Sequence, residues 1–429
     1  MADVVVVGGG VAGLVAARRI ALGGLTVTLL EASERLGGTV AHHAVGGIEL
    51  DAGAESFSTR RDTVANLARE LGLGDDIVTP NPAPAWLQPS IGAAVQLPAT
   101  NLLGIPGSPL ASDVVAVLGG RAAFRAYLES LLPGTVGARA GTLGELVRLR
   151  MGRAVLERLV APVTYGVYSS HPDELDLDRV APGLRVALRR EGSLARAVRD
   201  IRFSAPAGAL VAGIRGGLHR IVVALTADLD RLGVDVRTGV RVDSVEVGHV
   251  RSAAETFGGS VVVAAPGLFG DRVAGQRRVV LATLVVDEPL LDVAPRGTGV
   301  LVATGAHGIA ARALTHATAK WPWLAERADG KHVIRLSYDT DPVGLIGTAI
   351  ADASALLGVP IAPESVVDFA RVEGIRPAAG ITGPGIADPA IHAADGITVV
   401  GEAAAGTGLA AIVAQATAQS ESLLEDTVK

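Results

Sequence analysis

The spacing of hydrophobic residues changes twice near the amino terminus. A continuous apolar run at Val4–Val7 is followed by glycines, by apolar residues at helical spacing up to about Leu22, and by the strand-like segment LTVTLLE at 25–31. Such a succession predicts a buried strand, a tight turn, a helix and a second strand. The chain is therefore expected to begin with a β-α-β unit.

Further along, helical and strand-like spacing occupy separate regions. Residues 111–132 and 142–163 repeat apolar residues at helical spacing. Residues 277–369 instead contain strand-like segments such as RRVVLATLVVD and KHVIRLSYD, and residues 234–267 alternate strand-like runs with turns. This pattern predicts an α/β protein with a helical region between its strand-rich parts.

Length and composition narrow the class of protein. At 429 residues the chain exceeds the roughly 250–300 residues that one core supports, so two or more domains are expected. A content of 49% hydrophobic and 19% charged residues favours folded cores over disorder. The formal net charge of -6 offers no basic footprint, so no nucleic-acid partner is expected.

Cysteine and histidine usage limits the chemistry. The absence of cysteine excludes disulfides, thiolate metal ligands and a cysteine nucleophile. The nine histidines are scattered, and the adjacent pair His42 and His43 would point apart on a strand, so no metal site is expected. The cytoplasm is the expected compartment, because the apolar run from Val4 leaves no room for a basic secretory leader.

Two uncharged stretches raise the question of a membrane. Residues 77–112 contain seven prolines, which would leave lipid-exposed backbone groups without hydrogen bonds. Residues 403–420 are rich in Ala, Gly, Thr and Gln, and are too polar for a spanning helix. No transmembrane segment is expected, while peripheral membrane contact through residues 77–112 stays open.

The first turn carries a dinucleotide-binding pattern. Gly8, Gly10 and Gly13 have the G-x-G-x-x-G spacing between a strand and a helix. Gly8 would allow the tight turn, Gly10 the approach of a pyrophosphate, and Gly13 close packing of helix on strand, while the helix start at Val11 and Ala12 favours the anion. Glu31 ends the second strand, where its carboxylate can accept from ribose hydroxyls.

The segment that follows decides which dinucleotide is expected. EASERLGGTV at 31–40 resembles the E-A-x-x-R-x-G-G pattern of the flavin-containing amine oxidase superfamily, which makes FAD the preferred cofactor over NAD. IELDAGAESFSTRR at 48–61 and GITVVGEAAAGTGLAAIVAQA at 396–416 resemble two further flavin-contact segments of that superfamily, and residues 234–267 resemble its return to the flavin domain. The resemblance implies these cofactor contacts: Glu31, Ala32, Arg35, Gly38, Thr39, Gly53, Ala54, Glu55, Ser56, Val242 (backbone to adenine), Gly401, Glu402, Thr407, Gly408 and Leu409.

The same resemblance implies a discontinuous flavin domain. The expected fold is α/β, with a Rossmann-like FAD-binding domain in three parts, a mixed-sheet substrate domain and an inserted helical domain. The expected boundaries are 1–78, 205–266 and 376–429 for the FAD-binding domain, 79–110 and 267–375 for the substrate domain, and 111–204 for the helical domain.

Two segments resemble a narrower family, the protoporphyrinogen and coproporphyrinogen oxidases. Residues 142–184 contain its R-x-G helix, Leu-Val-x-Pro turn and Gly-Val-Tyr, and residues 297–323 its Gly-x-Gly-x-Leu-Val run and Lys-Trp-Pro. The family oxidises a porphyrinogen by six electrons in three hydride steps, with molecular oxygen as acceptor and hydrogen peroxide as by-product. The arginine-rich, cysteine-free chain is similar to actinobacterial-type members, so coproporphyrinogen III is preferred to protoporphyrinogen IX as the substrate.

The candidate reaction site lies around two of only four tyrosines, Tyr165 and Tyr168, which flank Gly166. The resemblance places this segment across the flavin ring, with Gly166 small for the macrocycle and Tyr165 beside it. A helix end whose tyrosines fill a core explains the same pattern. Propionates on the substrate call for arginines at the rim, for which Arg61 and Arg376 are the candidates, together with neighbouring Arg60.

Other functions stay open at this stage. The chain departs from the porphyrinogen oxidases at 84–97 and at 375–380, where propionate contacts cannot be transferred. An amine oxidase, a desaturase, or a flavin- or porphyrin-binding protein without catalysis would share the flavin motifs. The sequence gives no indication of the oligomeric state.

Overall fold

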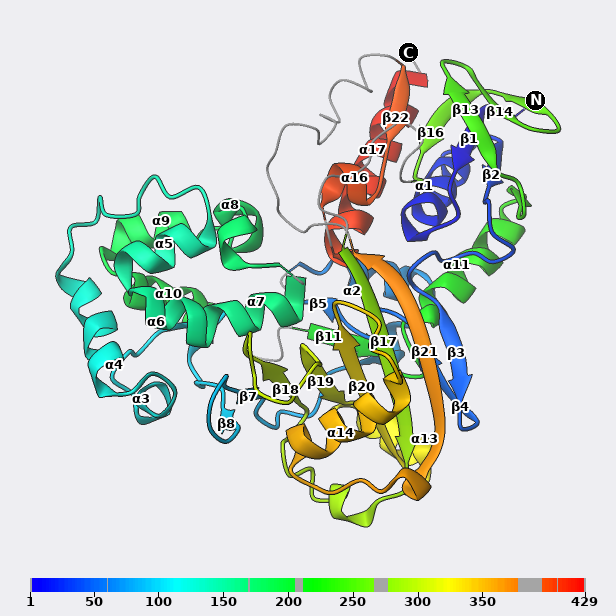
Figure 1. Cartoon of the computed structure of the whole chain (residues 1–429). Helices are drawn as coiled ribbons and strands as arrows, with labels where there is room; N and C mark the ends of the chain where they lie inside the picture. The colour runs from blue at the N-terminus through cyan, green and yellow to red at the C-terminus, as the bar shows by residue number, and fades with distance from the viewer. Residues whose placement is uncertain are drawn as a thin grey trace.

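The computed structural model describes residues 2–59, 61–168, 170–204, 211–265, 277–376, 396–406 and 408–427. The structure has three regions. The helical region lies to one side, the strand-rich region lies below, and the third region contains both chain ends (Figure 1). Among the described residues no helix is long and apolar enough to cross a membrane.

The third region is built on a five-stranded parallel sheet. Its order is β12-β2-β1-β16-β22, so the first strand lies at the centre and the chain winds outward on both sides. This is the strand order of a doubly wound dinucleotide-binding fold. The strands are β1 Val4–Val7, β2 Val27–Leu30, β12 Asp235–Arg237, β16 Ser260–Val263 and β22 Ile397–Val399.

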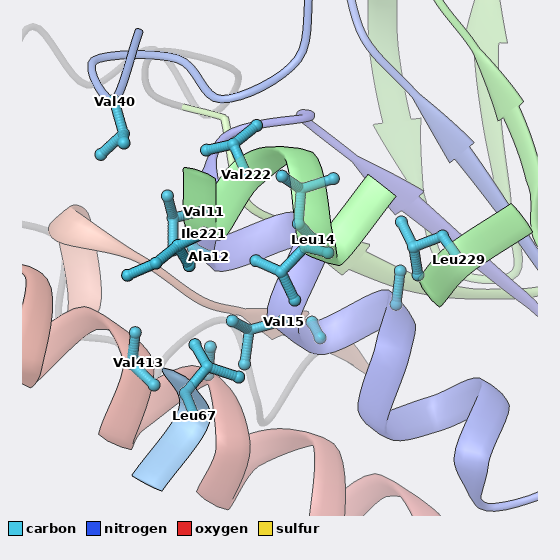
Figure 2. Packing of buried hydrophobic residues seen from close by; sticks show 14 of the residues in the cluster. Val11, Ala12, Leu14, Val15, Val40, Leu67, Ile221, Val222, Leu229 and Val413 are labelled. Atoms are coloured by element: carbon cyan, nitrogen blue, oxygen red, sulfur yellow. The ribbon is translucent and has the colours of Figure 1, made fainter. Parts of the chain in front are cut away.

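Helices from distant parts of the sequence share one core beside this sheet. In Figure 2, Leu14 and Val15 of α1 (Val11–Leu22) lie among Ile221 of α11 (His219–Arg231), Leu67 of α2 (Thr63–Glu70) and Val413 of α17 (Leu409–Thr427). These side chains are at most 2% exposed, and burying each contributes about 1.5–3 kcal/mol. The amino-terminal, middle and carboxy-terminal segments therefore form one body.

The strand-rich region is a seven-stranded mixed sheet in the order β21-β17-β20-β19-β18-β7-β8, in which only β18 and β7 run parallel. Ile334 and Leu336 share the core of α14 (Leu345–Leu357), so Arg335 between them points to the opposite face. The strands are β7 Trp86–Gln88, β8 Val95–Gln96, β17 Arg277–Val286, β18 Gly299–Val302, β19 Ala313–His316, β20 His332–Tyr338 and β21 Val366–Arg376.

The helical region is built on a hydrophobic core and contains a buried ion pair. Arg150 and Glu129 are both fully buried, and Arg150 Nε donates to a Glu129 carboxylate oxygen at 2.9 Å. The main helices are α3 Ser112–Leu118, α4 Gly120–Tyr127, α5 Leu143–Arg150, α6 Arg153–Val155, α7 Ala161–Tyr168, α8 Leu177–Val180, α9 Leu184–Glu191 and α10 Leu194–Ser204. The hairpin of β9 (Asn101–Leu102) and β10 (Ile105–Pro106) packs on the same core.

Short elements join the regions. The hairpin of β3 (His42–Val45) and β4 (Ile48–Asp51) packs against the large sheet, and β5 (Phe57–Ser58), β11 (Val211–Ile214) and β6 (Ile77–Val78) form a small sheet. The connection from β19 to β20 contains α12 (Ala317–Lys320) and α13 (Pro322–Ala328). A third small sheet joins β13 (Val242–Glu246), β14 (His249–Ser252) and β15 (Thr256–Gly258). The α/β fold with a mixed sheet and a helical region is as expected.

Candidate functional site

The three motif glycines occupy three different environments at the turn from β1 to α1. Gly8 has φ +109°, and a Cβ there would lie 2.9 Å from the backbone of Ala264. A Cβ on Gly13 would lie 1.8 Å from the Gly8 carbonyl oxygen, so no larger residue fits between helix and strand. Nothing lies within 4 Å of the corresponding position at Gly10. The turn therefore presents open backbone at Gly10, at the start of a twelve-residue helix.

Two other segments meet this turn. Gly37 donates its N–H to the Gly9 carbonyl oxygen at 2.8 Å, which lays the Arg35–Thr39 segment along the glycine turn. From the carboxy-terminal segment, Gly401 comes so close to α1 that a Cβ on it would lie 3.0 Å from the Cβ of Ala12. The convergence occurs at the carboxyl ends of the parallel strands, where this fold class binds its ligands.

Glu31 lies directly after β2 and faces the glycine turn. One carboxylate oxygen accepts from the Gly9 N–H at 2.7 Å, and the other accepts from the N–H and hydroxyl of Ser33 at 2.8 and 2.7 Å. The Glu31 carbonyl oxygen accepts from the N–H of Val240, just before β13, so Val242 and Glu31 belong to the same edge of the site. Arg35 donates to the Gly38 carbonyl oxygen at 3.1 Å and braces the same loop.

Glu55 joins two regions of the chain through a buried charge cluster. Lys320 Nζ lies 2.5 Å from one Glu55 oxygen, and Arg335 lies 3.0 Å from the other and donates to the Gly53 carbonyl oxygen at 2.9 Å. Burial alone would raise the pKa of Glu55, but the charges and hydrogen bonds of Lys320 and Arg335 lower that pKa to about 2. Two cations against one carboxylate leave a local excess of positive charge beside residues 53–56.

The carboxy-terminal segment brings a second carboxyl group to the site. Glu402 opens α16 (Glu402–Ala405), and burial raises its pKa to about 7. Gln415 of α17 fixes the preceding turn, since its side chain accepts from the Gly401 N–H and donates to the Val399 carbonyl oxygen. Positions 406 and 408 both have positive φ and open surroundings, and Leu409 begins α17. Thr407 lies outside the described residues.

The tyrosine segment forms α7, which rests on the large sheet. A Cβ on Gly166 would lie 2.4 Å from Leu301 Cδ2 of β18, so the glycine lets helix and sheet approach closely. Tyr168 packs against the core of the helical region. Tyr165 instead lies edge-on to His171, with the Arg312 guanidinium 5.7 Å from its ring centre. The two tyrosines thus have different environments, one in a core and one beside charged groups.

The family model for flavin containing amine oxidoreductases matches residues 11–273 of this chain. The chain belongs to that family. It is therefore a flavin-dependent oxidoreductase.

Curated relatives give a narrower comparison. The chain is 29% identical over 449 residues to the coproporphyrinogen III oxidase of Mycobacterium leprae, covering 97% of both chains. It is 26% identical over 383 residues to the coproporphyrinogen III oxidase of Staphylococcus aureus, covering 82% of this chain and 80% of the relative. The chloroplastic protoporphyrinogen oxidase of rice is 32% identical over 271 residues, which covers 57% of this chain and 47% of that protein.

Solved structures share the fold of this family member. A provisionally named protoporphyrinogen oxidase from Exiguobacterium sp. 255-15 superposes with a TM-score of 0.81 at 22% identity, covering 99% of this chain and 98% of the other. Reduced UDP-galactopyranose mutase superposes with a TM-score of 0.73 at 14% identity, covering 100% and 95%. At these identities the likeness concerns the fold alone, and it confirms the expected Rossmann-like flavoprotein architecture.

The residues present fit a bound flavin nucleotide. Gly10 offers approachable backbone at a helix start for a pyrophosphate, as the open space at its Cβ position shows. Glu31 lies at the strand end where a ribose is held in this fold class. The excess positive charge around Glu55 suits a ring that gains negative charge on reduction.

The described part of the structure does not bring together the arginines predicted as propionate ligands. Arg61 is exposed two residues before α2, and Arg376 is the last residue of β21, where its side chain lies outside the description. Arg60 is outside the described residues altogether. No group of three or more metal-ligating side chains occurs in the described part of the chain.

Sequence reasoning missed Arg335 and Arg312. Both lie in or beside strands of the large sheet, far in sequence from the flavin motifs. One signal was available for Arg335, an arginine within the apolar run of β20, because a charge there needs a partner on the side away from Ile334 and Leu336. The identity of that partner, Glu55, depends on tertiary structure.

Proposed function

We propose that this flavoprotein is an FAD-dependent oxidase that converts coproporphyrinogen III to coproporphyrin III in haem biosynthesis. Each of three cycles would remove a hydride equivalent and pass two electrons to molecular oxygen, giving hydrogen peroxide. The observation that carries the proposal is similarity to coproporphyrinogen III oxidases along nearly the whole chain, including 97% coverage of both chains for the Mycobacterium leprae relative. The cytoplasm is the proposed compartment, since a chain without cysteine needs no oxidising environment.

FAD binding is assigned to the segments that converge at the parallel sheet. In this proposal Gly8, Gly10, Val11, Ala12 and Gly13 form the pyrophosphate turn. Glu31 holds the ribose and the Val242 backbone borders the adenine. The remaining contacts come from Ala32, Arg35, Gly38, Thr39, Gly53, Ala54, Glu55, Ser56, Gly401, Glu402, Thr407, Gly408 and Leu409.

The flavin, when bound, supplies the hydride acceptor, and the chain supplies position and charge. Lys320 and Arg335 keep Glu55 ionised and hold the 53–55 backbone in place. In the proposed substrate site, Tyr165 and Gly166 of α7 border the macrocycle, and Arg61 and Arg376 are the proposed propionate ligands. The proposed domain limits remain 1–78, 205–266 and 376–429 for FAD, 79–110 and 267–375 for substrate, and 111–204 for the helices.

Protoporphyrinogen IX is the second candidate substrate, because the rice protoporphyrinogen oxidase is 32% identical over 271 residues. The two substrates differ in carrying four propionates or two. Turnover of both by one preparation of the flavin-loaded protein, followed by porphyrin fluorescence and peroxide release, separates them. We expect the higher kcat/KM for coproporphyrinogen III. A higher value for protoporphyrinogen IX would reverse the substrate assignment.

A test of the cofactor assignment uses the glycine turn. Replacing Gly10 by valine fills the open space at the helix start, so the purified protein should be colourless although folded. Gly120, which opens α4 and likewise has nothing within 4 Å of the corresponding position and no positive φ, provides the matched control, and its valine variant should remain yellow. Flavin retained by the Gly10→Val variant would refute the assignment.

A further inference from the structure

Two hollows lie beside α13, and Trp323 lines both. The inner one has a volume of about 20 Å³, and the outer one is an open groove of about 460 Å³. A space of about 20 Å³ holds only one or two water-sized molecules, so no macrocycle can enter the inner cavity. The Trp323 ring is thus a shared wall between the outside groove and a small interior space.

The inner cavity reaches the charge cluster beside residues 53–56. Asp51, Glu55 and Arg335 line it, together with apolar side chains that include Leu50, Ala317 and Leu324. Two of its polar atoms, Arg335 Nε and Trp323 Nε1, are buried and find no acceptor among the described residues. Buried donors without a partner destabilise the fold, and an oxygen-bearing guest in this cavity would offset that cost.

The outer groove is polar and charged. Its lining consists of the basic residues Arg215, Arg220 and Arg327, the carboxylates Glu49 and Glu326, and the rings of His219 and Trp323. A groove of this kind is wetted by solvent and exchanges small polar molecules freely. It lies beside β4, β11 and α13, whereas the proposed substrate residues Tyr165 and Gly166 lie on α7 against β18.

We propose that these two hollows form a route for dioxygen to the flavin and for hydrogen peroxide away from it, with Trp323 as the partition. The idea rests on the proposed function, which makes dioxygen the electron acceptor. In each cycle the reduced flavin gives up two electrons, and one dioxygen takes them with two protons to become hydrogen peroxide. A separate route lets this exchange proceed while a macrocycle stays at α7 for its next hydride step.

The cavity lining suits both molecules. Apolar walls at Leu50, Ala317 and Leu324 accommodate dioxygen, while the free N–H groups of Arg335 and Trp323 can donate to the oxygens of peroxide. Lys320 and Arg335 place positive charge beside the cavity, but Asp51 and Glu55 supply two carboxylates to its lining. The free N–H groups, rather than net charge, would therefore hold an oxygen-bearing guest.

The test measures re-oxidation without any porphyrinogen. The flavin of the holoprotein is reduced anaerobically by light with EDTA as the electron donor. The protein is then mixed with buffer containing dioxygen at several concentrations, and the return of the oxidised flavin band is followed. Ala317→Leu narrows the cavity, Ala317→Val narrows it less, and Trp323→Ala removes the partition. Phe203→Ala, at an aromatic residue on α10 that is 82% exposed, is the control.

We expect Ala317→Leu to lower the second-order rate constant, and Trp323→Ala to raise it, by at least about fivefold, equivalent to about 1 kcal/mol in the barrier. Ala317→Val should fall between Ala317→Leu and the wild type, and Phe203→Ala should match the wild type. Rate constants in both Ala317 variants equal to that of the wild type would overturn the route. Because no porphyrinogen is used, a failed route and a failed substrate assignment give separate results.

Discussion

Glu55 is the residue whose replacement tests the charge cluster most sharply. Its carboxylate lies between Lys320 and Arg335, and the three side chains are only 10–18% exposed. Replacing Glu55 by glutamine keeps the shape of the side chain and removes its charge. The change leaves both cations partly buried without a counter-ion, a situation that typically destabilises a protein by about 3–5 kcal/mol.

The pKa of Glu55 gives an independent magnitude. The folded-state pKa is about 2, against 4.5 for an ordinary glutamate. Each unit of difference is worth about 1.4 kcal/mol, so the ionised carboxylate contributes about 3 kcal/mol to the free energy of unfolding. Because the folded pKa is the lower one, this contribution is fully present above pH 4.5 and is lost as the pH falls towards 2.

Urea unfolding followed by tryptophan fluorescence measures the effect, since the Trp321 ring lies 5.1 Å from Lys320 Nζ. At pH 7 the Glu55→Gln variant should lose about 3 kcal/mol, and the difference from wild type should shrink below pH 4.5. Glu49→Gln is the control, since the Glu49 side chain is 42% exposed and its change should cost less than about 0.5 kcal/mol. A decrease in the free energy of unfolding of less than about 1 kcal/mol in Glu55→Gln would show that the charge cluster does not stabilise the fold.

Substitutions at three further sites, Gly166, Arg150 and Glu402, test other features of the protein. Gly166→Val should block turnover while flavin absorbance is retained. Adding Leu301→Ala removes the side chain that the valine would meet, so the thermal midpoint should recover but turnover should not. Recovery of turnover would show that Gly166 serves packing alone. Arg150→Met should cost about 3–5 kcal/mol in urea unfolding, because it leaves the buried Glu129 carboxylate without its cation; a loss below about 1 kcal/mol would contradict this. Burial raises the pKa of Glu402 in the folded protein to about 7, so the free energy of unfolding of the flavin-free protein should decrease as the pH rises from 4.5 to 7. A Glu402→Gln pH profile identical to that of wild type would exclude Glu402 as the cause.

Much of the fold could be predicted because local patterns determine it. The run Val4–Val7 is buried on both faces, as parallel central strands are, and the glycine turn and α1 follow where the spacing places them. Packing between segments that are distant in the sequence could not be predicted from these local patterns. Nothing in residues 101–106 indicates that this hairpin packs on α10, since its partners are fixed by the tertiary fold.

The candidate site also contains residues with a local sequence signal and residues without one. Glycines and a strand-end carboxylate carry a local signal, because the backbone geometry that a dinucleotide needs restricts which residues can stand there. The pairing of Lys320 and Arg335 with Glu55, and of Arg312 with Tyr165, has no local signal, because these side chains meet across regions. The sequence could therefore predict the flavin turn, whereas the charge cluster required the structure.

The central claim is that a porphyrinogen reduces the flavin of this protein, and anaerobic mixing tests it directly. The flavin-loaded protein is mixed with coproporphyrinogen III without oxygen, and flavin absorbance and porphyrin fluorescence are recorded together. The account predicts bleaching of the flavin, followed by its recovery and by porphyrin fluorescence once air is admitted. Flavin absorbance that stays unchanged with coproporphyrinogen III and with protoporphyrinogen IX alike would contradict it.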